Sequence, residues 1–344
     1  MNKNSRKLNS IKIEQAIKKT NTQWVDVRSP REYEKGHFTN AINLPIFNNK
    51  QFSNLGIVYK NEGQDKAIEL GQEYASSRSS AIINKLSELR NKDIILYCAR
   101  GGMRSEGMHI LLNNRGFNVS RIHRGYKSIR EHMLSSFKMQ KKLIILGGNT
   151  GSGKTTILNK MKSKGLSIID LEKIANHRGS TFGNLGLSKQ VTQQQFENNL
   201  AFEWVNTPNQ DYTYIESESR KIGRVVIPSE VWKNMSKSKY IKIDMGIERR
   251  VKNLLKEYGS PDKIILREKV DNIEKRLGGQ NAKIAKEQLD KNDLPKFCKL
   301  LLENYYDKLY KRSFNKRSTQ REVIKIDTES NDEIINKIIK ATNG

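Results

Sequence analysis

The chain has 344 residues, of which 35% are hydrophobic and 29% charged, a composition that suits two globular domains. No apolar run reaches the roughly 18 residues that a membrane span needs, and no apolar segment follows the basic N-terminus, so we expect a cytoplasmic protein that neither crosses a membrane nor is secreted. The 63 Lys and Arg residues outnumber the 37 Asp and Glu residues, and the net charge of +26 favours a polyanionic partner such as nucleic acid.

The first part of the chain alternates strand and helix signals. A short apolar strand is predicted at residues 24–27, and Ser29 and Glu32 after it fit the two reciprocal positions of a capping box at the start of a helix. A second strand is predicted at residues 94–97 and a second helix at 105–113. Strand, loop and helix repeated in this way predict a parallel α/β domain.

A cysteine with glycine and arginine neighbours stands where the second of these strands ends. Cys98 is followed by Arg100, Gly101, Gly102 and Arg104. Loop amides and the N-terminus of the next helix favour a thiolate, and the two glycines let amides point inward and surround an anion. The arginines add positive charge. The loop therefore predicts a reactive cysteine that can hold a persulfide, a selenide or an oxyanion.

The same loop fits a second chemistry. The spacing from Cys98 to Arg104 is also that of cysteine-dependent phosphatases, in which the arginine grips a phosphate while the thiolate attacks it. The loop alone leaves sulfur-group transfer and phosphate hydrolysis open. The other cysteine, Cys298, has leucines around it at helical spacing and is predicted to be a core residue.

A phosphate-binding loop follows the next predicted strand, at residues 143–146. Residues 148–155 satisfy the pattern G-x-x-x-x-G-K-[ST] and lead into a helix expected at 153–164. The loop amides cradle phosphate oxygens, Lys154 neutralises charge near the terminal phosphates, and Thr155 offers its hydroxyl to Mg²⁺. The predicted phosphate contacts are Gly148, Gly151, Ser152, Gly153, Lys154, Thr155 and Thr156. No motif for adenine or guanine follows, so ATP, GTP and a diphosphate ester all fit this loop.

Acidic residues end two of the later strands. Asp170 follows one strand, and Glu216 and Glu218 lie at the end of another. Each of these side chains is a candidate for holding a metal or positioning water, and a solvated strand end explains each equally well. Apart from Mg²⁺ at Thr155, the sequence predicts no metal site, because it contains no cluster with metal-ligand spacing.

The rest of the second half is predicted to be another parallel α/β unit with helical additions. Its later strands are expected at residues 167–170, 212–216, 240–244 and 323–326. Mostly helical sequence starts at residue 248, and a closing helix starts at residue 331. The basic stretch 138–142 is interpreted as the tail of a linker, so the two domains are predicted at residues 1–137 and 138–344.

Three motifs around the first helix resemble the rhodanese family. They are DVRSPREY at residues 26–33, GHF at 36–38 and AINLP at 41–45, and Cys98 falls where the reactive cysteine of that family would stand. The resemblance implies a rhodanese-like N-terminal domain followed by a P-loop NTPase-like domain.

That domain order resembles the tRNA 2-selenouridine synthase family nearly end to end. Further motifs carry the resemblance: residues 171–172, 176–180, 182–183, 195–198, 216–220, 222–223 and 276–279. Ala99 stands where the family usually has an aromatic residue, and Ser217 where it often has Asp. Neither change removes a reacting atom.

The resemblance implies a transferase that acts on wobble 2-thiouridine, U34, in tRNAs with Lys, Glu and Gln anticodons. Selenium from selenophosphate would replace the C2 sulfur after S-geranylation by geranyl diphosphate, and a selenophosphate-producing enzyme would be a partner. We hypothesise that Lys154 and Thr155 hold the prenyl diphosphate. Cys98 would carry or deliver selenium, with Arg100, Arg104 and the glycine amides stabilising its anionic forms.

Basic residues are candidate tRNA contacts. Arg178 is expected near the modified nucleotide, and a basic segment near the C-terminus is expected to bind the tRNA backbone through Lys308, Lys311, Arg312, Lys316 and Arg317. A solvated cationic face accounts for the segment equally well. Two other readings stay open: a cysteine phosphatase fused to a nucleotide kinase, and a non-enzymatic RNA-binding protein with degenerate loops.

Overall fold

The computed structural model describes residues 10–180, 182–183, 185–208, 211–258, 262–315, 321–326 and 330–343, without the side chains of 312–315, 321 and 326. The chain forms two compact units. Unit 1 comprises Met1–Ser136 and Glu197–Phe202, and unit 2 comprises Phe137–Phe196 and Glu203–Gly344. Among the described residues, no helix combines the length and apolar character needed to cross a membrane.

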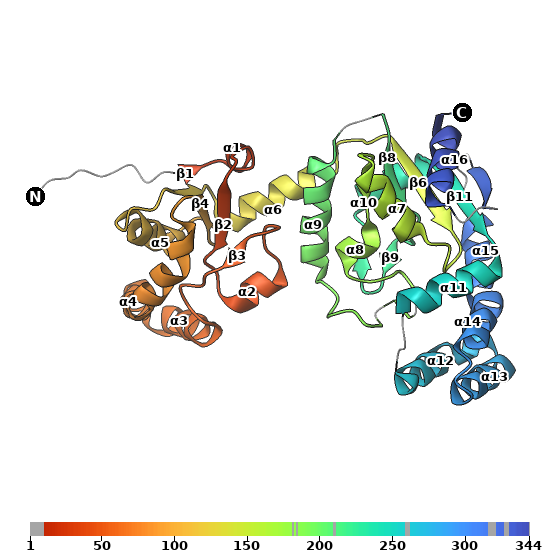
Figure 1. The fold of residues 1–344 in the computed structure, drawn as a ribbon. Coiled ribbons are helices and arrows are strands. Elements are labelled where there is room, and N and C mark those ends of the chain that lie inside the picture. The colour runs from red at the N-terminus through yellow and green to blue at the C-terminus, as the bar shows by residue number, and fades with distance from the viewer. Residues whose placement is uncertain are drawn as a thin grey trace, which may run out of the picture. The chain divides into compact units, whose positions relative to one another are not determined.

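Unit 1 contains a five-stranded parallel sheet, as its sequence predicts (Figure 1). The strands are, in spatial order, β1 (Ser10–Ile11), β5 (Val119–Ile122), β4 (Asp93–Tyr97), β2 (Thr22–Asp26) and β3 (Ile42–Asn43). The helices are α1 (Ile13–Ala16), α2 (Pro30–Lys35), α3 (Asn49–Glu62), α4 (Gln64–Leu86), α5 (Met103–Asn113) and α6 (Gly125–Ser136), with a 3₁₀ turn at Ser87–Leu89.

Local sequence signals explain where the helices of unit 1 begin. The predicted capping box before α2 is present, and Glu32 accepts the Ser29 amide at 2.9 Å. Helix α5 begins at Met103 rather than at the predicted residue 105, because Gly102 before it still has extended backbone and acts as N-cap. Helices α3 and α4 were not predicted. They bury little, with no fully buried side chain in α3, so their apolar periodicity is weak.

Unit 2 contains a second five-stranded parallel sheet. Its strands are, in spatial order, β12 (Arg321–Ile326), β11 (Lys239–Met245), β6 (Leu143–Gly148), β8 (Thr213–Glu216) and β7 (Ser167–Ile169). A short antiparallel pair, β9 (Lys221–Ile222) and β10 (Val225–Val226), lies apart from this sheet. The fold class predicted from the sequence, two parallel-sheet α/β domains, is confirmed.

Helices cover this sheet and form the predicted helical additions. Those interspersed with the strands are α7 (Lys154–Ser163), α8 (Leu171–Ala175), α9 (Gln193–Asn206), α10 (Ser229–Lys237) and α16 (Asn331–Asn343). The helical part consists of α11 (Ile247–Tyr258), α12 (Lys263–Leu277), α13 (Gly279–Asp290), α14 (Leu294–Leu301) and α15 (Asp307–Asn315), with a π-helical turn at Leu302–Tyr306 before α15.

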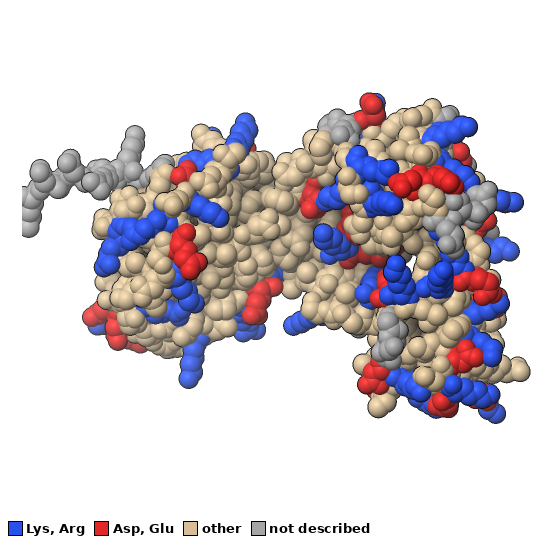
Figure 2. All heavy atoms as spheres, viewed as in Figure 1, with Lys and Arg blue, Asp and Glu red and all other residues tan. Residues whose placement is uncertain are grey.

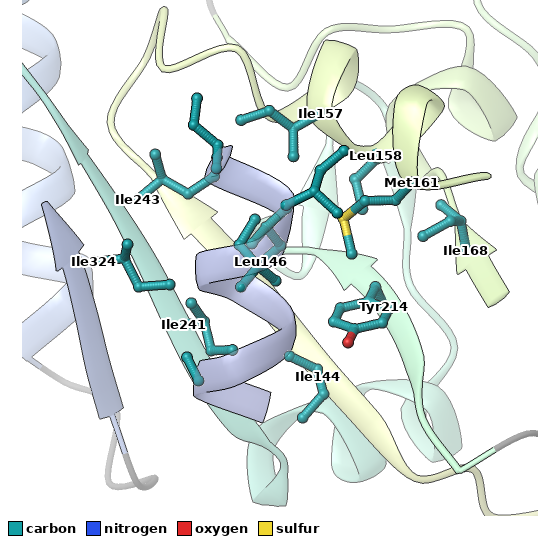
Figure 3. Close-up of a cluster of buried hydrophobic side chains, with 14 residues drawn as sticks. Ile144, Leu146, Ile157, Leu158, Met161, Ile168, Tyr214, Ile241, Ile243 and Ile324 are labelled. Atoms are coloured by element: carbon teal, nitrogen blue, oxygen red, sulfur yellow. The ribbon is translucent and has the colours of Figure 1, made fainter. Parts of the chain in front are cut away.

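The core of unit 2 fixes α7, and therefore the loop before it, against the sheet. Ile157, Leu158 and Met161 of α7 pack against Leu146 of β6 and Ile241 of β11 (Figure 3). All five side chains are at most 2% exposed. Their burial ties the position of the glycine-rich loop to the hydrophobic core between α7 and the sheet.

One residue of the stretch predicted as a linker tail, 138–142, is buried, and the other four are exposed. Lys141 is buried, at 4% exposure, and its amino group donates to the Thr207 carbonyl at 3.0 Å. A buried, hydrogen-bonded lysine anchors this stretch within unit 2. The basic, polar composition of this stretch led to its interpretation as a linker tail. The sequence alone does not indicate that the Thr207 carbonyl lies beside Lys141.

Candidate active site

Cys98 lies immediately after β4, as the sequence predicts, and its side chain is buried. The residue is 3% exposed, and its Sγ lies 3.3 Å from Ser105 Oγ. The Ser105 hydroxyl also reaches the Gly102 carbonyl at 3.0 Å. Ser105 is fully buried beside the sulfur, and it was not among the predicted site residues. A hydroxyl at this distance can donate a hydrogen bond to a thiolate or accept one from a thiol.

The first residues of helix α6 form hydrogen bonds with the backbone of the cysteine loop. The amides of Tyr126 and Lys127 donate to the carbonyls of Cys98 and Ala99, at 2.8 and 3.1 Å. Gly125, with φ +56°, makes this approach feasible, because a Cβ there would lie 2.3 Å from the Cys98 carbonyl oxygen. Gly125 is therefore a structural requirement of the loop, and it lies far along the sequence from the motif that it supports.

The two arginines of the cysteine loop differ in their surroundings. Arg104 donates to both oxygens of Glu32, at 2.7 and 3.1 Å, and its guanidinium lies 4.8 Å from the Phe52 ring centre. Burial alone would raise the pKa of Glu32, but the hydrogen bonds and charge of Arg104 hold it below its usual range. Arg100 is exposed. Arg104 is thus paired with Glu32, whereas Arg100 lies at the surface.

A buried ion pair lies behind the loop. Asp26 and Arg28, from the rhodanese-like motif, are 0% and 5% exposed and pair at 2.5 Å. The Arg28 guanidinium also lies 3.8 Å from the ring centre of Tyr126, whose amide holds the Cys98 carbonyl. Arg28 thus links the motif to Tyr126 and, through the Tyr126 amide, to the cysteine loop. Removing either Asp26 or Arg28 would leave the other charge buried without its partner.

The phosphate-binding loop joins β6 to α7 as predicted. Gly151 and Gly153 have φ of +80° and +70°, in the left-handed region that favours glycine. Lys154 Nζ donates to the Gly148 carbonyl at 3.0 Å. The Ser152 hydroxyl is buried and has no hydrogen-bond partner among the described residues. An unsatisfied buried hydroxyl inside such a loop fits a loop built to receive an anion.

Helix α11 supports this loop from outside, which the sequence did not predict. Arg250, 4% exposed, donates to the Thr150 carbonyl at 2.9 Å and pairs with Asp307 at 2.6 Å. Asn253 donates to the Gly151 carbonyl at 2.8 Å. These bonds occupy loop carbonyls, so the loop can present its amides to a phosphate.

A carboxylate cluster lies beside Thr155. The Thr155 hydroxyl lies 3.1 Å from Glu216 Oε1 and 3.3 Å from Glu172 Oε2. Glu216 also accepts the Glu172 amide at 3.1 Å. Burial and the charge of Glu172 raise the pKa of Glu216 well above its usual value, and burial and the charge of Glu218 raise the pKa of Glu172 to about 8.

The three predicted acidic candidates have different positions. Glu216 meets Thr155, and Glu218 lines the same cavity as the phosphate-binding loop. Asp170 caps α8 by accepting the Lys173 amide at 2.8 Å, and burial raises its pKa. Glu172 was missed. Its sequence signals were its position two residues beyond Asp170, the acidic residue that follows a strand, and its place in the family motif at residues 171–172.

Oxygen donors suited to Mg²⁺ meet at Thr155. Its hydroxyl and the Glu216 carboxylate fit an ion that keeps most of its waters and takes only one or two protein ligands. Among the described residues, no group of three or more His, Cys, Asp and Glu side chains is arranged to hold a metal ion. Thr155 and Glu216 are thus the residues that would hold Mg²⁺ together with a bound phosphate.

A cavity of about 1240 Å³ opens over the phosphate-binding loop. Six cationic residues line it: Lys154, Arg178, Arg220, Arg249, Lys252 and Lys256. Arg178 lies in this wall, where it pairs with Glu257 at 3.0 Å and lies 4.9 Å from the Tyr258 ring centre. The cavity is large and cationic enough for a polyanionic substrate as well as a diphosphate.

The predicted C-terminal basic segment is described only in part. Lys308 and Lys311 are exposed on α15. The side chain of Arg312, and Lys316 and Arg317 entirely, lie outside the described residues. Figure 2 shows Lys and Arg side chains on the visible surfaces of both units, with acidic residues between them.

Known proteins resemble both units. Residues 11–132 match the sequence model of the rhodanese-like domain, and residues 141–342 match that of the tRNA 2-selenouridine synthase AAA domain. A tRNA 2-selenouridine synthase from Sulfurovum sp. (strain NBC37-1) is 33% identical over 84% of this chain and 88% of its own length. One from Shewanella frigidimarina (strain NCIMB 400) is 32% identical over 86% of this chain and 90% of its own length.

Proposed function

This chain belongs to the tRNA 2-selenouridine synthase family, and we propose that it is an enzyme that replaces the C2 sulfur of wobble 2-thiouridine, U34, by selenium in tRNA. The observation that carries the proposal is the presence in one chain of two loops whose chemistry suits anions. One surrounds a buried cysteine, and the other is a phosphate-binding loop in a cationic cavity. Replacement of sulfur by selenium needs two kinds of chemistry, and these sites supply them.

The first step is transfer of a geranyl group from geranyl diphosphate to the sulfur. A thiocarbonyl sulfur is a poor leaving group, and alkylation turns it into a thioether-like substituent on an electrophilic carbon. The sulfur forms a bond to C1 of the geranyl group while the bond from C1 to the diphosphate oxygen breaks. Lys154 and the loop amides stabilise the departing diphosphate, and Thr155 with Glu216 would hold Mg²⁺ on it.

The second step is displacement of the alkylated sulfur by selenium from selenophosphate. The selenium forms a bond to C2, the C2–sulfur bond breaks, and geranylthiol leaves with a proton. Water takes the phosphoryl group from selenium as phosphate, so no oxidant or reductant is needed. Cys98 delivers the selenium without forming a bond to it, because a sulfur–selenium bond would need an oxidant to form and a reductant to break. Arg100, Arg104 and the amides of Gly101 and Gly102 stabilise the anionic donor.

The net charge of +26 supports tRNA as the macromolecular substrate. We propose that Arg178 contacts tRNA near the modified base, and that Lys308, Lys311, Arg312, Lys316 and Arg317 contact its backbone. We propose that the substrates are tRNAs with Lys, Glu and Gln anticodons. A partner enzyme makes the selenophosphate, and the protein acts in the cytoplasm.

One incubation tests the proposal against its alternatives. The protein is mixed with 2-thiouridine tRNA, geranyl diphosphate, selenophosphate and Mg²⁺, and the nucleosides are identified by mass spectrometry. S-geranyl-2-thiouridine followed by 2-selenouridine is expected. Unmodified tRNA together with phosphatase turnover at Cys98 and nucleotide phosphorylation would favour the fused phosphatase and kinase. Binding of tRNA without any turnover would favour a non-enzymatic RNA-binding protein.

A further inference from the structure

A second, smaller cavity adjoins the phosphate-binding cavity in unit 2. Its volume is about 60 Å³, and its walls come mainly from leucine and phenylalanine side chains of the helical part, such as Leu266, Phe297 and Leu301. Both cavities share five lining residues: Thr150, Ser180, Leu254, Tyr258 and Tyr306. Thr150 belongs to the phosphate-binding loop itself, so the apolar cavity begins directly beside the phosphate site.

An apolar cavity that continues from a phosphate site fits one class of ligand. The ligand needs an anionic head for the loop and a short hydrocarbon tail for the pocket. A nucleotide does not fit this description, because its ribose and base are polar along their edges and would leave hydrogen-bonding groups unpaired against leucine and phenylalanine. A prenyl diphosphate has a diphosphate head and a wholly apolar tail.

We propose that this apolar pocket receives the distal isoprene unit of a prenyl diphosphate and so sets the chain length that the enzyme accepts. The inference rests on the proposed function, because it assigns the tail of the diphosphate ester placed at Lys154 and Thr155. The pocket walls come from α11, α12, α14 and the turn after α14, and Thr150 comes from the loop, so the head and tail sites form one continuous surface.

The volume of the pocket indicates the chain length. The pocket, at about 60 Å³, is about one twentieth of the 1240 Å³ of the phosphate-binding cavity, so it suits one short hydrocarbon unit rather than a long chain. A five-carbon prenyl diphosphate would leave the pocket empty, because its only isoprene unit carries the diphosphate. A ten-carbon geranyl chain fills the pocket with its second unit, and the third unit of a farnesyl chain finds no room there.

The residues around the pocket allow it to be filled without loss of a catalytic group. Cys298 on α14 and Leu255 on α11 both line the pocket, and both are half-buried. Cys298→Leu and Leu255→Phe each add carbon atoms to a space that is empty, so each variant should fold and keep or raise its Tm. Ile265 on α12 is 42% exposed and does not line the pocket, so Ile265→Phe is the matched control.

The test measures the binding of four probes by calorimetry: inorganic diphosphate and the dimethylallyl, geranyl and farnesyl diphosphates. The unmodified enzyme is expected to bind geranyl diphosphate on the order of 10- to 100-fold more tightly than the dimethylallyl ester, and no more weakly than the farnesyl ester. Both pocket-filling variants should lose most of that preference while binding inorganic diphosphate as before, and Ile265→Phe should retain it.

Two results would overturn the inference in different ways. If the unmodified enzyme binds geranyl diphosphate and the two filling variants bind it equally well, the tail lies elsewhere, and the proposed function stands. The same conclusion follows if farnesyl diphosphate gains a further 10-fold or more over the geranyl ester. If the unmodified enzyme binds inorganic diphosphate but shows no preference for any prenyl ester, both the pocket assignment and the prenyl-transfer step are wrong.

Discussion

The Thr155 hydroxyl donates a hydrogen bond to the buried Glu216 carboxylate at 3.1 Å. Thr155 is the second residue of α7, and Glu216 ends β8. The two residues meet because β8 pairs directly with β6, with Leu146 opposite Glu216. The parallel pairing of these strands brings a carboxylate to the carboxyl end of the sheet, beside the phosphate-binding loop. Polar residues from separate βα units therefore converge on one ligand site.

Lys154→Ala should reduce geranyl transfer by about 10²- to 10³-fold, because the ammonium group stabilises charge that grows on the departing diphosphate. The rate is measured as S-geranyl-2-thiouridine formed in single-turnover reactions. Lys160→Ala is the control, because Lys160 lies on the same helix and pairs with Asp332 at its surface. An unchanged rate in Lys154→Ala would remove the loop from this step.

Cys98→Ser should abolish selenation and leave S-geranylated tRNA to accumulate. The serine hydroxyl has nearly the same shape as the thiol but does not ionise or handle selenium as a thiolate does. Nucleoside mass spectrometry after reaction with both co-substrates measures the two products separately. Loss of geranylation in a folded Cys98→Ser protein would contradict the division of labour between the two sites.

Gly125→Ala should disrupt the cysteine loop from a distance. The left-handed backbone and the 2.3 Å approach of a Cβ to the Cys98 carbonyl predict a loss of about 3 kcal/mol in the free energy of unfolding. Selenation should fall much more than geranylation, which depends on unit 2. Gly107→Ala on α5 meets open space and should leave stability equal or slightly higher. Urea unfolding and the product assay check both variants.

The carboxylate cluster predicts how stability depends on pH. The folded protein raises the pKa of Glu172 to about 8, above its ordinary value near 4.5, through burial and the charge of Glu218. A raised folded-state pKa means that Glu172 contributes its full stabilisation below pH 4.5 and loses it as the pH rises through 8. The free energy of unfolding should therefore fall by a few kcal/mol over this range.

Glu172→Gln isolates the contribution of this group, because the neutral amide does not titrate. Urea unfolding between pH 5 and 9 should give a flatter pH dependence for Glu172→Gln than for the unmodified protein. Glu230→Gln, at an exposed position on α10, should keep the full dependence. Equal slopes in Glu172→Gln and the unmodified protein would rule out Glu172 as the titrating group.

Binding of tRNA should weaken steeply with salt. Each phosphate contact made by a cation adds about 0.9 to the slope of log affinity against log salt, for a duplex region. The double variant Lys308→Ala, Lys311→Ala should lower that slope by up to about 2 if both side chains reach the backbone. Filter binding at several salt concentrations measures it, with Lys66→Ala on α4 as the control. A nearly flat dependence for the unmodified protein would contradict backbone-dominated binding.

Local sequence patterns were sufficient to locate the reacting parts of both sites. Cys98 and Lys154 each lie within a few residues of a hydrophobic strand end and of a glycine pattern, which follows Cys98 and precedes Lys154. The chemistry of each loop and its place at a strand end are therefore encoded together. The five strands of the second sheet and β2 and β4 of the first were predicted for the same reason, because buried parallel strands read as short continuous apolar runs. The strands β1, β3 and β5 were not predicted. The weakly buried α3 and α4 lack such a signal.

The residues that support the two loops were decided by contacts between distant segments of the chain. Gly125 beneath the cysteine loop, Arg250 behind the phosphate-binding loop and Glu172 beside Thr155 are 27, 100 and 17 residues from the groups they contact. No local pattern predicts these contacts, although Glu172 lies in the family motif at residues 171–172. The apolar pocket is a further example, because it exists only where helices of the C-terminal part pack beside Thr150. The sequence determines which chemical groups are available. The packing of distant segments determines that the Cys98 carbonyl is held by α6, that the pKa of Glu172 is raised, and that an apolar pocket lies beside the phosphate-binding loop.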